Sequence, residues 1–187
     1  MYRKIKVKIK GVTPLLMNKL NPEDLKAKTR SRLKQFNPEE EARKSAYIDV
    51  INGKRQLYIP SEAIFRAMIN ASGIYRTRKM SLKGILAGSI RIEPEKIPLG
   101  KDKYEIDIRP VRIQKDAVLR ARAKVPNWEA EFFLIYDDEL IKDSEILLRI
   151  LKDAGKRFGL LDYRPQTGGP FGVFEVVEFK EIRKKAK

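Results

Sequence analysis

A glycine-rich segment near the C-terminus holds the residues whose types and spacing best suit ligand binding. It runs from Gly155 to Gly172 and places a tyrosine and an arginine between its glycines. Glycine lets a backbone approach a ligand closely, tyrosine can stack on a nucleobase, and arginine binds phosphate. A helix end followed by a Pro-Gly turn would also explain the glycines, but not the residues between them. The candidate nucleic-acid-binding residues here are Tyr163, Arg164, Gly168, Gly169 and Phe171.

Lysines and arginines form three further groups that suit phosphate binding. The first follows an expected helix, the second covers two expected strands, and the third flanks the glycine-rich segment. In the second group, alternation places every second side chain on one sheet face, where a single strand of nucleic acid could lie. The same charges would also suit the solvated surface of a thermophile-like protein. The candidates are Arg76, Arg78, Lys79 and Lys83; Arg109, Arg112, Arg120, Arg122 and Lys124; and Lys156 and Arg157.

The composition favours a polyanionic partner and restricts the chemistry. Lysine and arginine number 41 against 25 acidic residues, a formal net charge of +16, which favours salt-sensitive binding to nucleic acid. The chain has no cysteine and no histidine. This excludes disulfides, thiol nucleophiles, zinc sites built on these residues and the usual general base at neutral pH. We therefore predict no cofactor, no metal and no catalytic residue.

Length and hydropathy predict one soluble domain. A chain of 187 residues suits a single domain better than two independent ones. No apolar run approaches the roughly 18 residues of a membrane span, and the first residues lack a signal-peptide core. We therefore expect a cytoplasmic protein with no membrane partner.

Alternation of apolar and polar residues predicts the strands. Residues 3–10 carry lysines on one face and aliphatic side chains on the other. Residues 47–59 predict a hairpin with Asn52-Gly53 in its tight turn. Further strands are expected at 90–97, 104–113, 117–125, 130–136 and 173–179.

Two amphipathic helices are expected between these strands. Ser61 can cap the first, which ends at Gly73, and Asp143 or Ser144 can cap the second, which ends at Gly159. Trp128 opens a strand and is expected to anchor the core rather than stack on a ligand.

The order of the strongest elements predicts an α+β fold. Strands 3–10, 117–125, 130–136 and 173–179, with the two helices, give a ferredoxin-like (RRM-like) β-α-β-β-α-β core with a large insertion between the first helix and the second core strand. The remaining segments of the single domain 1–187 are a helical or mobile insertion at 22–46, a β-rich insertion at 74–116 and a charged tail at 180–187.

Several of these motifs resemble the RAMP superfamily of CRISPR systems, whose members are RNA-recognition-motif-like proteins. The glycine-rich segment with Phe171–Phe174 is one of them. The segment Tyr58–Arg66 looks like the proline-serine helix start of backbone subunits of effector complexes, and Gly11–Leu15 looks like their first-strand exit. Small uncharacterised phage and provirus proteins carry a similar pattern, including the Asp162–Pro165 step.

The resemblance implies an RNA-associated protein, closest in pattern to the backbone subunits. Guide-processing members commonly use a histidine, which this chain lacks. We therefore predict binding of single-stranded nucleic acid, RNA favoured over DNA, mainly through backbone contacts. A homo-oligomer or a filament along the nucleic acid is also compatible with this prediction.

Two alternative functions remain open from the sequence. The first is a metal-independent endoribonuclease of the guide-RNA-processing type, using Tyr163 or a lysine, with Arg164 stabilising the transition state. The second is an assembly protein of a phage or defence complex. In that case the apolar loop Val12–Met17 would dock a protein partner, although the same loop could cap the core.

Overall fold

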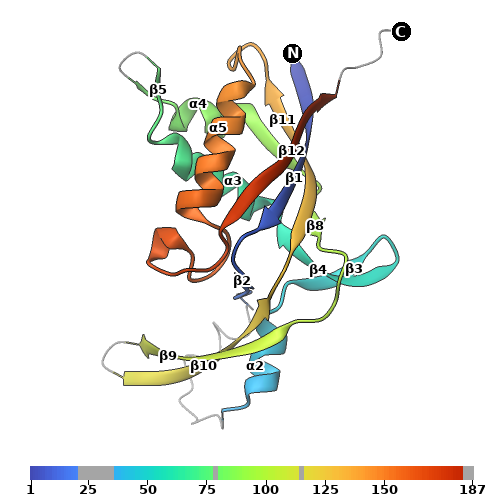
Figure 1. Ribbon diagram of the computed structural model, residues 1–187, viewed down its shortest axis with the longest axis vertical. Coiled ribbons are helices and arrows are strands. Elements are labelled where there is room, and N and C mark those ends of the chain that lie inside the picture. The colour runs from blue at the N-terminus through green and yellow to red at the C-terminus, as the bar shows by residue number, and fades with distance from the viewer. Residues whose placement is uncertain (21–35, 78–79, 114–115, 183–187) are drawn as a thin grey trace.

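A four-stranded antiparallel sheet with two helices on one face forms the main body of the protein. The computed structural model describes residues 1–20, 36–77, 80–113 and 116–182 (Figure 1). The strand order across the sheet is β12-β1-β11-β7, and every neighbouring pair is antiparallel. The strands are β1 (Tyr2–Gly11), β7 (Ile90–Glu93), β11 (Glu129–Asp137) and β12 (Phe174–Ile182).

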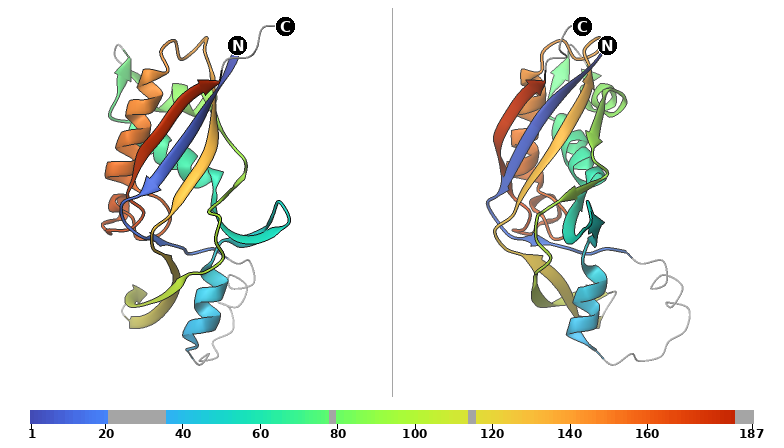
Figure 2. Two further views of the ribbon diagram at one scale, coloured as in Figure 1. Left: turned by 45° about the vertical axis from the view of Figure 1, so that its right-hand side comes forward. Right: turned by 90° about the vertical axis from the view of Figure 1, so that its right-hand side faces the viewer.

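The helices α3 (Ser61–Ser72) and α5 (Glu145–Asp153) cover one face of this sheet, and the opposite face is open (Figure 2). In chain order α3 lies between β1 and β7, and α5 lies between β11 and β12. Each helix therefore connects two strands that have one other strand between them. The protein is an α+β protein, as predicted.

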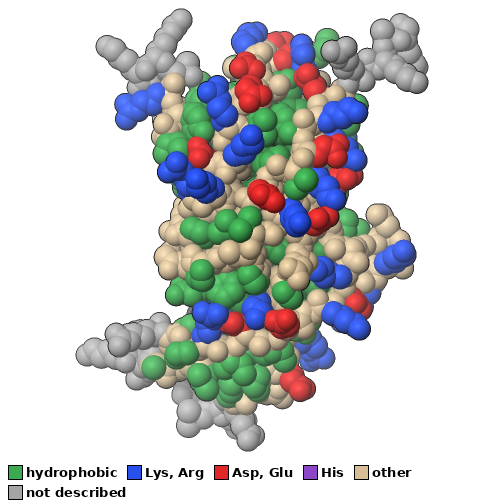
Figure 3. Space-filling view, in the orientation of Figure 1, with side chains coloured by type: hydrophobic (Ala, Val, Ile, Leu, Met, Phe, Trp, Pro, Cys, Tyr) green, Lys and Arg blue, Asp and Glu red, His purple; other side chains and the backbone are tan. Residues whose placement is uncertain are grey.

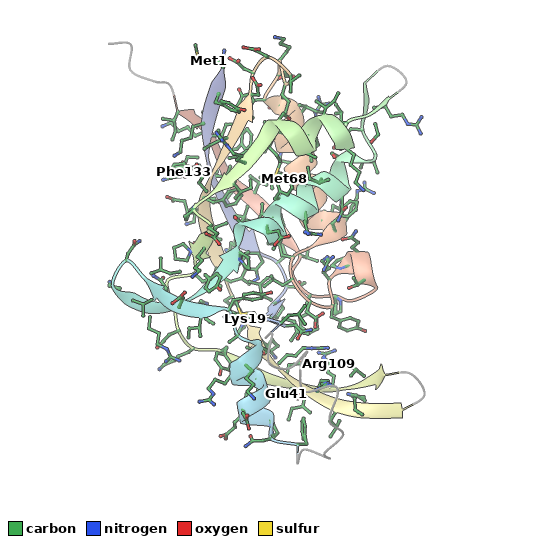
Figure 4. All side chains as sticks on the ribbon, turned by 180° about the vertical axis from the view of Figure 1, so that it is seen from behind. Met1, Lys19, Glu41, Met68, Arg109 and Phe133 are labelled. Carbon is green, nitrogen blue, oxygen red and sulfur yellow. The ribbon has the colours of Figure 1, made fainter. Side chains whose placement is uncertain are left out.

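The core forms where the alternating face of β1 meets the apolar stripes of the helices. Ile5, Val7 and Ile9 have no exposed surface, and neither do Met68 of α3 and Leu151 of α5. Figure 4 shows Met68 between its helix and the sheet. Burying such side chains supplies most of the free energy that holds the two layers together, at about 1.5–3 kcal/mol each.

The expected second core strand lies in a different sheet. Residues 117–125 belong to β10 (Asp116–Val125), which pairs with β9 (Glu105–Ile113) and β2 (Leu15–Leu16). The fourth strand of the main sheet is the shorter β7, within the segment 74–116 that the sequence assigns to an insertion. Alternation specifies that a segment is a strand, but it does not specify which strand it pairs with. The prediction therefore placed residues 117–125 in the main sheet at the position that β7 occupies.

The β9–β10 hairpin packs against the helix α2 (Pro38–Ser45) at one end of the molecule (Figures 1 and 2). This helix is the described part of the expected insertion at 22–46, and Asn37 caps it by accepting a hydrogen bond of 3.2 Å from the Glu40 amide. Residues 21–35 lie outside the described part of the chain.

A third sheet contains the predicted hairpin. It joins β3 (Ile48–Ile51), β4 (Lys54–Pro60) and β8 (Lys96–Pro98). Asn52 and Gly53 have φ angles of 52° and 74°, as a tight hairpin turn requires. The small elements between α3 and β7 are β5 (Arg76–Thr77), β6 (Met80–Ser81) and α4 (Lys83–Ser89).

The open face of the main sheet carries the lysines of β1, and neighbouring strands neutralise most of them. Lys4, Lys6 and Lys8 form ion pairs of 3.4, 3.1 and 2.7 Å with Glu93, Glu131 and Glu129. Lys4 also lies 4.1 Å from the centre of the Phe133 ring, which Figure 4 places on this sheet. This face therefore offers little excess charge, and the Arg91 guanidinium covers its exposed Tyr2 ring at 4.7 Å. RRM-type sheets instead present uncovered aromatic rings on which bases stack.

Candidate nucleic-acid interface

The glycine-rich loop is held against the loop that leaves β1. The Gly172 amide donates to the Pro14 carbonyl at 2.8 Å, and the Asp162 amide donates to the Leu16 carbonyl at 3.0 Å. Leu15, Leu16 and Met17 have no exposed surface. Leu15, Leu16 and Met17 thus cap the core, while Val12 is 62% exposed, so most of the apolar side chains of this loop are buried rather than available for docking.

The glycines of this loop serve its own packing. A Cβ atom on Gly169 would lie 1.9 Å from the Tyr163 carbonyl oxygen, and one on Gly172 would lie 2.1 Å from the Leu160 carbonyl oxygen. The Gly168 and Gly169 amides donate within the loop, to Pro165 and Arg164, both at 3.0 Å. Contrary to expectation, these amides are occupied by the protein itself.

The two aromatic side chains of the loop differ in accessibility. Tyr163 is 39% exposed, whereas Phe171 is only 6% exposed, so Phe171 cannot stack on a base. Their ring centres lie 6.1 Å apart, and the Arg109 guanidinium covers the Phe171 ring at 4.7 Å. Figure 4 shows Arg109 on the β9–β10 hairpin. Tyr163 is the accessible ring of this pair.

The predicted row of cations on β10 is neutralised by ion pairs. Arg120 pairs with Glu41 of α2 at 2.5 Å, Arg122 with Asp162 of the glycine-rich loop at 2.9 Å, and Lys124 with Glu105 of β9 at 2.7 Å. Figure 4 shows Glu41 on α2, which packs along this strand. Arg109 likewise holds Asp107 at 2.6 Å. Arg120 and Arg122 thus join the hairpin to the rest of the protein, whereas Lys124 and Arg109 pair within it, and both kinds of pairing disfavour the expected groove along β10.

We expect Arg122→Ala to lower the free energy of unfolding by about 1–2 kcal/mol, because it leaves the Asp162 carboxylate without its cation. Only 17% of the Arg122 side chain is exposed, and Asp162 Oδ2 has no hydrogen bond to compensate. Urea unfolding followed by circular dichroism measures the change. The double variant that also carries Asp162→Ala should be more stable than Arg122→Ala alone. If Arg122→Ala and the wild type unfold with equal free energies, the Arg122–Asp162 ion pair does not stabilise the fold.

A cleft of about 560 Å³ lies between the glycine-rich loop, the start of α3 and the β3–β4 hairpin. Among its lining residues are two tyrosines, three cations and three side-chain amides, which are the donors and surfaces that nucleotides use. These lining residues are Tyr47, Tyr58, Arg66, Lys96, Arg164, Asn18, Asn70 and Gln166.

The start of α3 contributes a positive end to this cleft. Its N-cap is Pro60, which has no side-chain hydrogen bond to offer, and Ser61 is the first helical residue rather than the predicted cap. Ser61, Glu62 and Ala63 all line the cleft. The Ser61 amide donates to the Glu95 carbonyl at 2.8 Å, and the amides that follow it in the first turn have no side-chain cap. Such amides at a helix N-terminus favour a negative ligand group.

The cations of the cleft are positioned by neighbours that leave them hydrated. Arg164 donates to the Leu161 carbonyl at 2.7 Å and to the Gln166 side chain at 3.1 and 3.2 Å. Arg66 pairs with Glu62 at 2.7 Å, but both side chains are more than 60% exposed. Such an exposed ion pair contributes little to the free energy of folding, so a phosphate can replace Glu62 as the partner of Arg66 at little cost.

Of the two tyrosines of the cleft, Tyr47 is half-buried and Tyr58 is only 7% exposed, so Tyr47 supplies the accessible ring. Tyr47 and Tyr58 contact edge to face, with ring centres 5.6 Å apart. Burial raises the pKa of both hydroxyls, so the rings remain neutral at physiological pH. The Lys96 ammonium lies 5.7 Å from the Tyr58 ring, and its hydrogen bond to Asp49 raises the pKa of Lys96.

The remaining predicted cations gather on the helix side of the molecule. Arg76 and Lys83 are exposed near the end of α3, and Lys156 and Arg157 are exposed at the end of α5. The two groups meet where the Tyr75 hydroxyl donates to Asp153 at 2.5 Å. Arg78 and Lys79 lie outside the described residues, as does the side chain of Arg112.

The sequence prediction missed most of the cleft. Arg164 was expected, but Tyr47, Tyr58, Arg66 and Lys96 were not assigned to a site. The segment Tyr58–Arg66, in which a proline precedes a helix start, could have indicated this site, but it entered the prediction only through its resemblance to backbone subunits. The hairpin tyrosines gave no such signal, because alternating aromatic residues equally suit a buried strand.

Within the described ranges, no group of three or more acidic side chains is arranged to hold a metal ion. No helix in the described part of the chain is both long and apolar enough to cross a membrane.

These features define an α+β protein with a one-sided antiparallel sheet and a mixed aromatic and cationic cleft beside it. No family model and no curated protein matches the chain. Among solved structures, it is similar to a chain in the cryo-EM structure of the type III-B Cmr-beta bound to cognate target RNA, with a TM-score of 0.60 and 12% sequence identity. The match covers 97% of this chain and 61% of the other, so this protein spans less than two thirds of its structural neighbour.

A second similarity is to a chain of a CRISPR RNA-guided surveillance complex, at 12% identity over 80% of this chain and 58% of the other. Its TM-score of 0.35 is too low to support an argument. The likeness to the Cmr-beta chain shows a shared fold.

Proposed function

We propose that this protein is a RAMP-like, ferredoxin-like subunit that binds single-stranded RNA in the cleft between α3 and the glycine-rich loop. The observation that carries the proposal is the composition of the cleft, in which Tyr47, packed on the buried Tyr58 ring, lies beside Arg66, Arg164 and the start of α3. Aromatic rings next to cations are the usual means of holding a single strand without reading its sequence.

The fold supports the same proposal. The chain order β1, α3, β7, β11, α5, β12 and the sheet order β12-β1-β11-β7 fit a ferredoxin-like core, with β7 as its second strand. The structural neighbour is a chain of the type III-B Cmr-beta bound to target RNA, which favours RNA over DNA as the ligand. The carboxylates Glu62, Glu95 and Asp162 in the cleft limit its net charge, so we expect moderate affinity.

Fluorescence anisotropy with a labelled 12-nucleotide single-stranded RNA tests the proposal. We expect Arg66→Ala combined with Arg164→Ala to raise Kd about tenfold or more, since a hydrogen bond to a charged group is worth about 1.5–3 kcal/mol. The slope of log Kd against log salt should fall by about 1.4, because two phosphate contacts are lost from a single strand.

Removal of two cations elsewhere provides the matched control. Lys54 and Lys103 are exposed, lie outside the cleft and form no ion pair in the described structure. Lys54→Ala with Lys103→Ala removes the same charge and should leave Kd within about threefold of the wild type. If both double variants lose affinity equally, binding depends on net charge and the cleft is not the site.

A further inference from the structure

A second basic surface lies on the outer side of the helix layer, apart from the cleft. Arg149, Lys152 and Lys156 are exposed at spacings of three and four residues, so they share one side of α5 and the turn that extends it. Figure 3 shows basic side chains over α5 and beside β5 in the upper left of the view. We call this surface the helix-side patch and include in it Arg76, Lys83 and Arg157.

The carboxylate within the helix-side patch is already occupied. Asp153 Oδ2 accepts a 2.5 Å hydrogen bond from the Tyr75 hydroxyl, and Oδ1 accepts one of 3.1 Å from Arg157. Arg149, Lys152 and Lys156 form no ion pair within the described residues. This contrasts with β1 and β10, where carboxylates pair with most of the cations. Cations without local partners retain their full attraction for a polyanion.

Among the described residues, no aromatic ring of the helix-side patch is fully exposed. Tyr75 is half-buried, its hydroxyl is held by Asp153, and burial together with this hydrogen bond raises its pKa to about 12. The cations project outward from a helix, so they present a convex surface rather than a cleft. Such a surface can contact phosphates but offers nothing on which a base can stack.

We infer that the helix-side patch binds double-stranded nucleic acid through its phosphates alone. The chain would then hold two segments, one with its bases stacked in the cleft and one by charge on the exposed side of α5. The inference rests on the unpaired cations of α5 and does not require the cleft to bind RNA.

A blunt RNA duplex tests the inference, because its bases are stacked and paired and cannot enter the cleft. We expect wild-type protein to bind a labelled 16-base-pair RNA duplex and a DNA duplex of the same sequence, with a strong salt dependence. The variant Arg149→Ala, Lys152→Ala, Lys156→Ala should raise Kd for both duplexes at least tenfold and lower the salt slope by about 2.7, at 0.9 for each lost contact.

Two controls separate the helix-side patch from net charge and from the cleft. Lys54→Ala, Lys103→Ala, Lys180→Ala removes the same charge from exposed positions elsewhere and should change duplex Kd by less than threefold. The Arg66→Ala, Arg164→Ala variant should bind duplex like the wild type while losing single-stranded RNA.

Three results would overturn the inference: no duplex binding by the wild type, duplex binding that survives the α5 triple variant, or an equal loss in the charge-matched control. Circular dichroism confirms that each variant is folded, which is expected because every substituted side chain is exposed except Arg164, which is half-buried. If the cleft variant keeps its affinity for single-stranded RNA while the α5 variant loses duplex, the proposed function fails and this inference stands.

Discussion

Gly169→Ala should lower the free energy of unfolding by about 3 kcal/mol and the melting temperature by about 6–12 °C. The added Cβ would lie 1.9 Å from the Tyr163 carbonyl oxygen and 2.5 Å from the Tyr163 ring. Because the obstacle is backbone, the loop must open to admit the methyl group, and the bonds that join Gly169 to Arg164 and Phe171 to Tyr163 would weaken. Differential scanning calorimetry measures the change.

Gly88→Ala in α4 is the matched control. A Cβ at this position has no heavy atom within 4 Å, and alanine favours the helix over glycine by about 0.5–1 kcal/mol. This variant should therefore be as stable as the wild type or slightly more stable. If Gly169→Ala is equally harmless, the close packing of the loop is not what holds its conformation.

Trp128→Ala should produce the largest loss of stability, about 4 kcal/mol, with a fall in melting temperature of about 8–16 °C. The ring is 1% exposed, packs edge to face on Phe174 and donates from Nε1 to the Thr13 carbonyl at 2.9 Å. It also lies so close to Gly11 that a Cβ there would be 2.2 Å from Nε1. Urea unfolding, followed by circular dichroism, measures the loss.

Trp128→Phe separates packing from hydrogen bonding. It keeps a ring against Phe174 but leaves the Thr13 carbonyl without its donor, so we expect a smaller loss of about 1–3 kcal/mol. If the alanine and phenylalanine variants unfold at the same urea concentration, the hydrogen bond rather than the buried ring is the main contribution of Trp128. That outcome would contradict our assignment of Trp128 as a core anchor.

Much of the fold could be predicted because local patterns specify local elements. The lysine alternation gave β1, the Asn52-Gly53 turn gave the β3–β4 hairpin, and Gly159, with φ of 70°, ends the helical segment that follows α5. Trp128 was expected in the core and is buried there. Each of these predictions rests on residues close together in the chain.

The exchange of β7 for β10, and the fate of the predicted cations, depend on distant residues. Arg120 is neutralised by Glu41, 79 positions earlier, and Arg122 by Asp162, 40 positions later. Nothing in the local sequence separates a cation that pairs within the protein from one that remains free for a ligand. The net charge therefore predicted a polyanionic partner, but it did not predict which surface of the protein binds that partner.

The ion pairs on the open face of the main sheet influence the orientation in which the protein approaches a polyanion. Their lysines and glutamates leave one side of the protein almost neutral, while Arg149, Lys152 and Lys156 leave the helix side positive. A charge distribution of this kind acts as a dipole, which rotates an approaching molecule before contact. At a physiological Debye length of about 8 Å, the torque acts only in the last stage of approach. The asymmetry would therefore raise the rate of productive encounters at low salt by favouring one orientation.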